Sequence, residues 1–561
     1  MRRVAGLIAP ALVILTSPSC ITRDNTLGRN LVPLSHLYDV YTVEFPLTDI
    51  QMKMLDSLSG YSTYRMTIGA VRDKEFGLTT RATALSLVPI VDTLDFGRNA
   101  EFRYFRFTAA RDTVSYADPK EADILQNVNV YELAKPMDFT FVDLNTPVEH
   151  KSERITDGIP LYNGKDSLSF YFNRAFGEKY MQITLDDMKD METYLSKFPG
   201  IYIDTDEPVG IGGRINMFTL QLGVNSSYGY VTKDYAELAF TADYDGERKD
   251  TSFLFYFSPN DFLELDALVQ AKNNSDYYDY YTFPQYCFNT VTHETKGREG
   301  RPTDRICIEG GGGLKAVFSA QEIMDRLKED ISKHGDPADA IVTRASMILP
   351  FEFPDDYTEM FKYPDFISPT CRISHSEGVS YASLTDASSD DEDPGKLNRS
   401  LLQYSPDITY HIQKLLTLKD GSNISNYDIW TLITSTEYFL SEKDNSAAMS
   451  DYMLQMQQMM YLNSIYGGYG GYGYGGYGYG YGGYGYGGYG YGGYGGYGYG
   501  GMSNYYSMAL LASMYNSSTS STLRTRIDMD KDRYFNAVLN GPEAENGRVP
   551  KMRVIYAIPK E

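Results

Sequence analysis

Short runs of β-type residues, each ended by turn residues, are the feature that most constrains the fold of this 561-residue chain. Many of these runs alternate polar and apolar residues, as half-buried antiparallel strands do. The pair Asp245-Gly246 separates two of them and predicts a tight hairpin turn. We expect strands at 39–45, 84–90, 101–108, 168–172, 214–222, 236–242, 252–257, 314–318, 341–353 and 552–557.

Helix signals are sparse. Helices are expected over 184–199, 319–334 and 407–416, and in the second of these Ser319 and Glu322 are spaced as a capping box. Strands with few helices, and without a repeating strand–helix–strand rhythm, predict a mainly β protein. We therefore expect two or more antiparallel β-sandwich domains of jelly-roll-like form, with a few short helices.

The N-terminus has the layout of a bacterial export signal. Arg2 and Arg3 precede an apolar run at 4–15, small residues follow, and Cys20 comes next. This pattern predicts a lipoprotein signal peptide at 1–19, lipid attachment at Cys20 and a polar tether at 20–37. An ordinary secretory signal with an incidental cysteine is the alternative. The apolar run is shorter than the ~20 residues of a membrane-spanning helix, so we expect attachment through the N-terminal lipid.

The rest of the chain is expected to form an N-terminal β-sandwich region at 38–300 and a C-terminal β-sandwich domain at 301–561. The last expected strand lies close to the C-terminus and needs partners from much earlier in the chain. An insertion at 440–522 would then separate the final strands. Its segment Tyr466–Gly501 contains only 22 Gly and 14 Tyr, and glycine carries a high entropic cost of ordering. A fixed fold is not expected there.

Methionine and tyrosine residues flank this segment at helical spacing, which predicts two short helices bridged by a Gly/Tyr loop. Met-rich faces adapt to varied partners. The alternative is that both helices pack on their own domain and the loop is filler. The candidate contact residues are Met449, Met453, Met456, Met460, Tyr505 and Met508.

Charge and motif content exclude several classes of function. The net charge is −23, which disfavours a nucleic-acid partner. The six histidines show no metal-ligand spacing, so no metal, cofactor or catalytic residue is predicted. Gly310–Gly313 lacks the ending of a phosphate loop and is interpreted as a glycine bulge before a strand. The acidic runs at 204–207, 390–393 and 528–532 are interpreted as solvated loops. Pairing of Cys287 with Cys307 stays open.

Several stretches together resemble a family of Bacteroidota lipoproteins of unknown function. They are 24–28, 197–203, 312–315, 344–346 and 549–556. The closing pattern Pro-x-x-x-Val-x-Tyr is also similar to the last strand of jelly-roll modules in cell-surface proteins. The resemblance implies a lipid-anchored outer-membrane protein and carries no catalytic residues. Asp24 is the one acid soon after Cys20, so the periplasmic and surface faces both stay open.

These observations favour a non-catalytic binding or scaffolding role. We expect an accessory subunit of an envelope assembly, secretion or uptake complex, with an outer-membrane protein as its partner. A glycan-binding surface lipoprotein is the first alternative. An envelope glycoside hydrolase is the second, because the sequence does not tell which of its 74 acids would form a catalytic pair.

Overall fold

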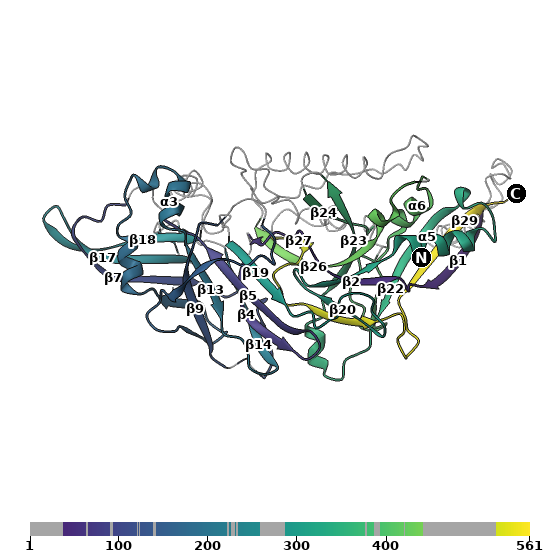
Figure 1. Cartoon of the computed structure of the whole chain (residues 1–561), viewed down its shortest axis with the longest axis horizontal. Helices are drawn as coiled ribbons and strands as arrows, with labels where there is room; N and C mark the ends of the chain where they lie inside the picture. Colours follow the sequence, from purple (N-terminus) through teal and green to yellow (C-terminus); the bar gives the residue numbers. More distant parts are fainter. Residues whose placement is uncertain are drawn as a thin grey trace, which may run out of the picture.

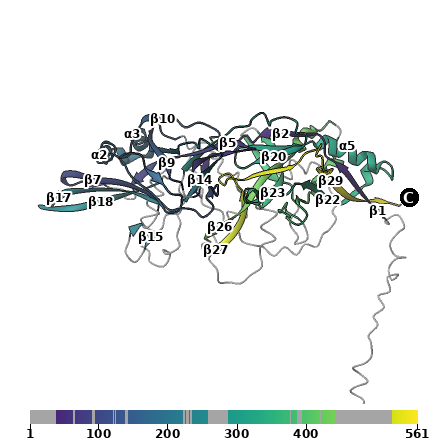
Figure 2. The same cartoon turned by 90° about the horizontal axis from the view of Figure 1, so that it is seen from below.

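The computed structural model describes residues 38–560, apart from 63–64, 90–93, 121, 123, 138–141, 221–223, 226–229, 232–233, 258–286, 376–377, 386–392, 420 and 441–522. Figure 1 shows an elongated molecule, with β7, β17 and β18 at one end and β1, β29 and α5 at the other. Figure 2 shows the same order along the long axis from below. The paired strands are antiparallel, and the prediction of a mainly β fold is confirmed.

The half that contains β7 has two large sheets and a short hairpin. The larger sheet runs β10-β9-β13-β5-β4-β14-β8, with β11, β19 and β3 attached to it, and the smaller runs β12-β7-β17-β18-β6. Their strands are β3 (Tyr61–Ser62), β4 (Arg65–Asp73), β5 (Gly77–Leu85), β6 (Leu87–Pro89), β7 (Arg98–Ala109), β8 (Tyr116–Ala117), β9 (Gln126–Leu133), β10 (His150–Arg154), β11 (Leu161–Tyr162), β12 (Leu168–Tyr171), β13 (Ile201–Thr205), β14 (Gly212–Thr219), β17 (Tyr235–Tyr244), β18 (Glu247–Phe257) and β19 (Cys287–His293), and the hairpin is β15 (Val224–Asn225) with β16 (Tyr230–Val231).

The other half has three sheets. A four-stranded sheet runs β1-β29-β22-β25, a six-stranded sheet runs β2-β21-β26-β23-β24 with β27 paired to β26, and β20 pairs with β28. Their strands are β1 (Tyr38–Pro46), β2 (Ile50–Met54), β20 (Arg305–Glu309), β21 (Leu314–Phe318), β22 (Ile341–Pro350), β23 (Phe366–His375), β24 (Gly378–Ser383), β25 (Gln403–Tyr404), β26 (Ile429–Leu440), β27 (Leu523–Met529), β28 (Asn536–Asn540) and β29 (Lys551–Pro559).

Short helices cover the sheets. They are α2 (Arg174–Tyr180), α3 (Met191–Lys197), α5 (Ala320–Ile331) and α6 (Thr409–Leu416), with the 3-10 turns η2 (Asp187–Lys189), η4 (Pro337–Asp339), η5 (Tyr357–Phe361) and η6 (Ile424–Tyr427). Helix α5 has Ser319 as its N-cap, as expected, but its capping box is incomplete. The Ser319 side chain accepts a bond from the Glu322 N–H, whereas the Glu322 carboxylate accepts from the backbone of Thr48 and Asp49. Glu322 therefore ties α5 to the segment before β2.

The single helix expected over 184–199 is wrong. Thr184 and Asp187 exchange hydrogen bonds that close a turn, and Asp190 adopts an extended conformation and caps a separate helix, α3. The expected strand at 84–90 is also wrong. It breaks at Ser86, where the chain passes from the larger sheet to the smaller one. One hydrophobic core then unites both sheets, with Phe105 and Phe255 from the smaller facing Val130 and Ile201 from the larger.

The sheets divide the chain differently from the expected boundary at residue 300. Strand β1 pairs with β29 along its whole length, and β2 pairs with β21, so residues 38–54 belong to the C-terminal sheets. The closing strand β29 thus finds its expected early partner. Strands β26 and β27 pair so that Leu440 lies opposite Leu523, and this places the two ends of the 440–522 insertion side by side.

Candidate functional site

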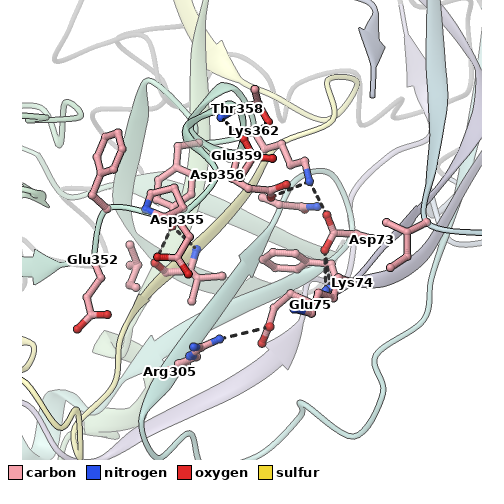
Figure 3. A pocket seen from close by; sticks show the side chains of 18 of the residues that line it. Asp73, Lys74, Glu75, Arg305, Glu352, Asp355, Asp356, Thr358, Glu359 and Lys362 are labelled. Carbon is pink, nitrogen blue, oxygen red and sulfur yellow. Dashed lines mark hydrogen bonds and ion pairs between the residues drawn. The ribbon is translucent and has the colours of Figure 1, made fainter. Parts of the chain in front are cut away.

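A groove with a volume of about 830 Å³ lies between the two halves of the molecule (Figure 3). The half that contains β7 contributes the β4–β5 turn and the segment around β8. The other half contributes the chain from 352 to 363 and strand β28. Ligand sites typically measure ~300–1,000 Å³, so the groove is large enough to hold a ligand.

The β4–β5 turn presents Asp73 to this groove. One of its carboxylate oxygens, Oδ1, accepts hydrogen bonds from the backbone N–H groups of Glu75 and Phe76, at 2.7 and 3.0 Å. Gly77 follows with a φ of +77°, a conformation that favours glycine, and opens β5. The turn therefore fixes Asp73 with its second oxygen, Oδ2, still available.

Lys362 reaches Asp73 from the opposite wall. It follows the 3-10 turn η5, where the Asp356 side chain caps the turn by accepting a hydrogen bond from the Thr358 N–H. Its ammonium nitrogen lies 2.6 Å from Asp73 Oδ2 and 2.7 Å from Glu359 Oε2, and Figure 3 shows Lys362 between these two carboxylates. The side chains of Lys362 and Asp73 are 8% and 6% exposed, so the ion pair is largely shielded from water.

The pKa values of this pair follow from burial opposed by charge. Burial disfavours the Asp73 carboxylate, but the Lys362 ammonium and the two backbone N–H donors hold its pKa below the usual value. Burial also disfavours the Lys362 ammonium, but Asp73 and the other anionic neighbours raise its pKa above the usual value. Both groups are therefore charged at neutral pH, and each forms an ion pair with the other.

Strand β28 forms a further part of the lining. The Tyr363 hydroxyl donates to the carbonyl of Val538 and accepts from its N–H, which occupies the backbone edge at this point. Asn536 is 3% exposed, and its Nδ2 has no hydrogen-bond partner among the described residues. It approaches the Tyr534 hydroxyl, but neither atom forms a hydrogen bond of normal geometry. The groove thus contains a buried amide donor that is not satisfied.

Acidic residues outnumber basic residues in the lining, nine to five. Arg305 pairs with Glu75 at 3.3 Å, and Arg72 lies within 3.6 Å of Glu207. The acids are Asp73, Glu75, Asp118, Asp304, Glu352, Asp355, Asp356, Glu359 and Glu545, and the bases are Arg72, Lys74, Lys120, Arg305 and Lys362. An excess of carboxylates gives the groove a negative potential.

Exposed aromatic side chains occur in the segment 352–363, which contributes one wall of the groove. Phe353 lines the groove and is 53% exposed, and Tyr357 and Phe361 on η5 are 66% and 65% exposed. The rings of Tyr357 and Phe361 meet edge to face, with centroids 6.3 Å apart. Large aromatic side chains are usually withdrawn from water, so a group of them beside a groove indicates a contact surface.

A second cluster of charged residues lies under the glycine loop 310–313. Lys315 donates to the carbonyls of Glu309, Gly311 and Gly313, while the Glu309 carboxylate accepts from Arg298 and from the Leu314 N–H. Burial raises the pKa of Glu309 and lowers that of Lys315. These contacts hold the loop against β21, so the cluster supports the fold, and the loop leads into a strand as predicted.

The structure describes only some of the sites expected from the sequence. Cys20, Met449, Met453, Met456, Met460, Tyr505 and Met508 lie outside the described residues, as does most of the acidic run 390–393. The interpretation of 528–532 as a solvated loop is wrong. Asp530 and Asp532 are both buried. Asp530 pairs with Arg533 at 2.7 Å, and Asp532 lies 3.7 Å from Arg65.

The cysteine question is settled by the sheet topology. Cys287 lies on β19 of the larger N-terminal sheet and Cys307 on β20, which pairs with β28. Cys287, Cys307 and Cys371 are all buried, and none of them forms a disulfide bond within the described residues. Burial raises the pKa of Cys307 to about 11, which makes this thiol unreactive at neutral pH.

Sequence reasoning missed the residues of the groove, because its walls are separated by almost three hundred positions. One local signal was present. Residues 352–363 intersperse acids with Phe353, Tyr357, Phe361 and one proline, an unusual composition for a loop that needs only to connect two strands. Nothing in the sequence indicated that Asp73 or Asn536 would face this segment.

No group of three or more His, Cys, Asp and Glu side chains suited to a metal ion occurs in the described ranges. In that same part of the chain, no helix combines the length and apolarity that crossing a membrane requires. No family model, curated protein or solved structure matches the chain significantly.

Proposed function

We propose that this chain is a lipid-anchored outer-membrane protein with a non-catalytic binding role. It acts as an accessory subunit of an envelope assembly, secretion or uptake complex and holds a protein partner in the groove between its halves. The anchor and the compartment rest on the export pattern before Cys20 and on the family resemblance. The binding role rests on the groove.

The observation that carries the binding role is the combination of satisfied charges with exposed aromatic side chains. The Asp73 and Glu359 carboxylates both contact Lys362, so the central charged groups of the groove already have partners. Phe353 in the lining stays exposed, and so do Tyr357 and Phe361 on the neighbouring turn η5. Aromatic side chains at the edge of a preformed pocket are the usual anchors of protein interfaces, so this arrangement favours holding a partner.

Purification from solubilised membranes tests the proposal. The full-length chain at native expression should recover an outer-membrane protein in stoichiometric amount. The double substitution Phe353→Ala and Tyr357→Ala should lose it, because it removes two anchors that support little of the core. Tyr410→Ala is the matched control, since Tyr410 lies on α6, outside the segment 352–363, and is 58% exposed. A clean monomer, or equal recovery by all three chains, contradicts the proposal.

The anchor and the compartment need a separate experiment. Cys20→Ser should abolish incorporation of labelled palmitate and release the protein from the membrane fraction. Protease treatment of intact cells then distinguishes the two faces of the outer membrane. Unchanged membrane association of the Cys20→Ser chain contradicts lipid anchoring.

Glycan binding is the second candidate function, and the unsatisfied Asn536 amide in the same groove as the exposed Phe353 ring favours it. Sugar rings stack on aromatic faces, and their hydroxyl groups accept hydrogen bonds from amides. A glycan array with the full chain tests this candidate, with Phe353→Ala as the diagnostic variant. Absence of binding across the array excludes it.

A further inference from the structure

We infer that the groove binds an extended segment of the partner that carries lysine or arginine side chains. This inference rests on the proposed function and specifies the chemistry that the groove recognises. It follows from three independent properties of the lining: its charge, its unsatisfied hydrogen-bond donor and its exposed aromatic ring.

The charge of the lining favours a cationic ligand. The lining contains nine carboxylates and five basic side chains, and the bases Lys362 and Arg305 are already paired with acids of the groove. Asp118 and Asp355 lie on the two opposite walls, and the ion pairs of the described lining residues do not include them. Electrostatic complementarity therefore selects a partner with positive side chains and speeds its association.

The buried Asn536 amide favours a ligand that carries a hydrogen-bond acceptor in addition to positive charge. Asn536 Nδ2 is a donor without a hydrogen bond of normal geometry among the described residues, and a buried donor costs free energy unless it has an acceptor, which a ligand could supply. A metal ion or a polyamine supplies charge but no acceptor, and a neutral sugar supplies an acceptor but no charge. A peptide supplies both, since its carbonyl groups accept while its lysine and arginine side chains carry the charge.

The Phe353 ring offers a third contact, which also favours a cationic ligand. Phe353 lines the groove with half of its side chain exposed, within the same segment as Glu352 and Asp355. A cation placed over an aromatic face gains ~0.5–1 kcal/mol at an exposed site. The segment 352–356 therefore offers a ring and carboxylates to one basic side chain.

Strand addition is not the mode of recognition at β28. The Tyr363 hydroxyl already bonds both the N–H and the carbonyl of Val538, and the Asn536 N–H donates to the Lys362 carbonyl at 2.8 Å. The backbone of β28 is thus occupied on the side that faces the groove wall. The ligand is recognised through side chains, together with the Asn536 amide.

The experiment uses the full-length chain in detergent and fluorescence anisotropy of labelled probes. The first probe is a peptide that alternates lysine with alanine, the second alternates glutamate with alanine, and spermine serves as a competitor. We expect saturable binding of the lysine peptide, weakened by added salt, with the glutamate peptide failing to bind. Spermine should compete at least about tenfold more weakly, because it offers no carbonyl to Asn536.

A pair of charge-neutralised chains localises the binding. Asp118→Asn with Asp355→Asn should weaken binding of the lysine peptide about fivefold, as expected for the loss of two exposed charge contacts. The matched control is Glu153→Gln with Glu329→Gln, which removes the same charge from exposed positions on β10 and α5. Phe353→Ala, at an exposed position where folding is not at risk, should weaken binding by a similar factor.

Two results overturn the inference. One is failure of the lysine peptide to bind the unmodified chain. The other is equal binding by the Asp118→Asn/Asp355→Asn chain and its control. If the outer-membrane partner still depends on Phe353 and Tyr357 in the purification, the proposed function stands and the ligand class alone is wrong. If the lysine peptide binds in the groove but no partner is recovered, the ligand class stands and the proposed function is wrong.

Discussion

The ammonium nitrogen of Lys362 lies 2.6 Å from the Oδ2 of Asp73, and this ion pair joins two halves of the molecule across 289 positions of sequence. Each partner is fixed from its own side, Asp73 by the β4–β5 turn and Lys362 by η5. The pair lies inside the groove, so it holds the two walls in position. A bound ligand would therefore meet a preformed site.

Removal of one partner of this pair should destabilise the protein strongly. Lys362→Met leaves the Asp73 carboxylate buried without its cation, and we expect a loss of about 3–5 kcal/mol in the free energy of unfolding. Urea denaturation of the full chain measures the loss. The control is Glu359→Gln, whose side chain is 44% exposed, and it should cost below about 1 kcal/mol. A loss for Lys362→Met as small as that of the control contradicts a structural role for the pair.

His411 should make stability fall in mild acid. Its Nε2 lies 3.1 Å from the Tyr427 carbonyl, a contact to which the neutral ring donates, and burial lowers its pKa to about 4. The unfolded chain has a histidine pKa of ~6.5, so it binds more protons between these two values. Stability is therefore full above pH ~6.5 and falls until the pH passes below the folded pKa, by ~3 kcal/mol in all. Urea denaturation of His411→Gln should show a smaller drop between neutral pH and pH ~4.5; an equal drop contradicts the assignment.

Gly200 should not tolerate a side chain. Its φ is +107°, and a Cβ atom there would lie 2.1 Å from the carbonyl oxygen of Leu85 on the neighbouring strand. We expect Gly200→Ala to lower the unfolding free energy by roughly 2–6 kcal/mol, from backbone strain and overpacking together. Gly210→Ala is the matched control, because a Cβ there meets no atom within 4 Å. Equal melting temperatures for the two variants would contradict the close packing of β13 on β5.

Deletion of Tyr466–Gly501 should leave the fold intact. The backbone positions of Leu440 and Leu523 are paired in β26 and β27, so the strands that flank the insertion are held together without it. Shortening a loop changes its closure entropy slowly, by below about 1 kcal/mol here. The melting temperature should shift by no more than a few degrees. A large decrease in it would show that the Gly/Tyr segment packs against the body of the protein.

The sequence predicted local structure well wherever one signal acted alone. The alternating runs identified β7, β12, β17, β18 and β29, and Asp245-Gly246 forms the expected turn, with φ values of 53° and 84°. Prediction failed where a tertiary contact competed with the local signal. Glu322 had the spacing of a capping box, yet its carboxylate bonds to the backbone of Thr48 and Asp49. The acids of 528–532 had the composition of a solvated loop, yet Arg65 and Arg533 pair with them in the folded protein.

By itself, the sequence determined the β class of the fold and the need of the last strand for an early partner, and it predicts an anchor at Cys20, which lies outside the described residues. These properties depend on side-chain alternation and composition, which are local. Only the tertiary structure decided that β1 and β2 join the C-terminal sheets, that Cys287 and Cys307 stay apart, and that Asp73 faces Lys362. Strand pairings and ion pairs of this kind bring together residues hundreds of positions apart, and no local pattern specifies them because each partner offsets the cost of burying the other only when the two meet in the fold.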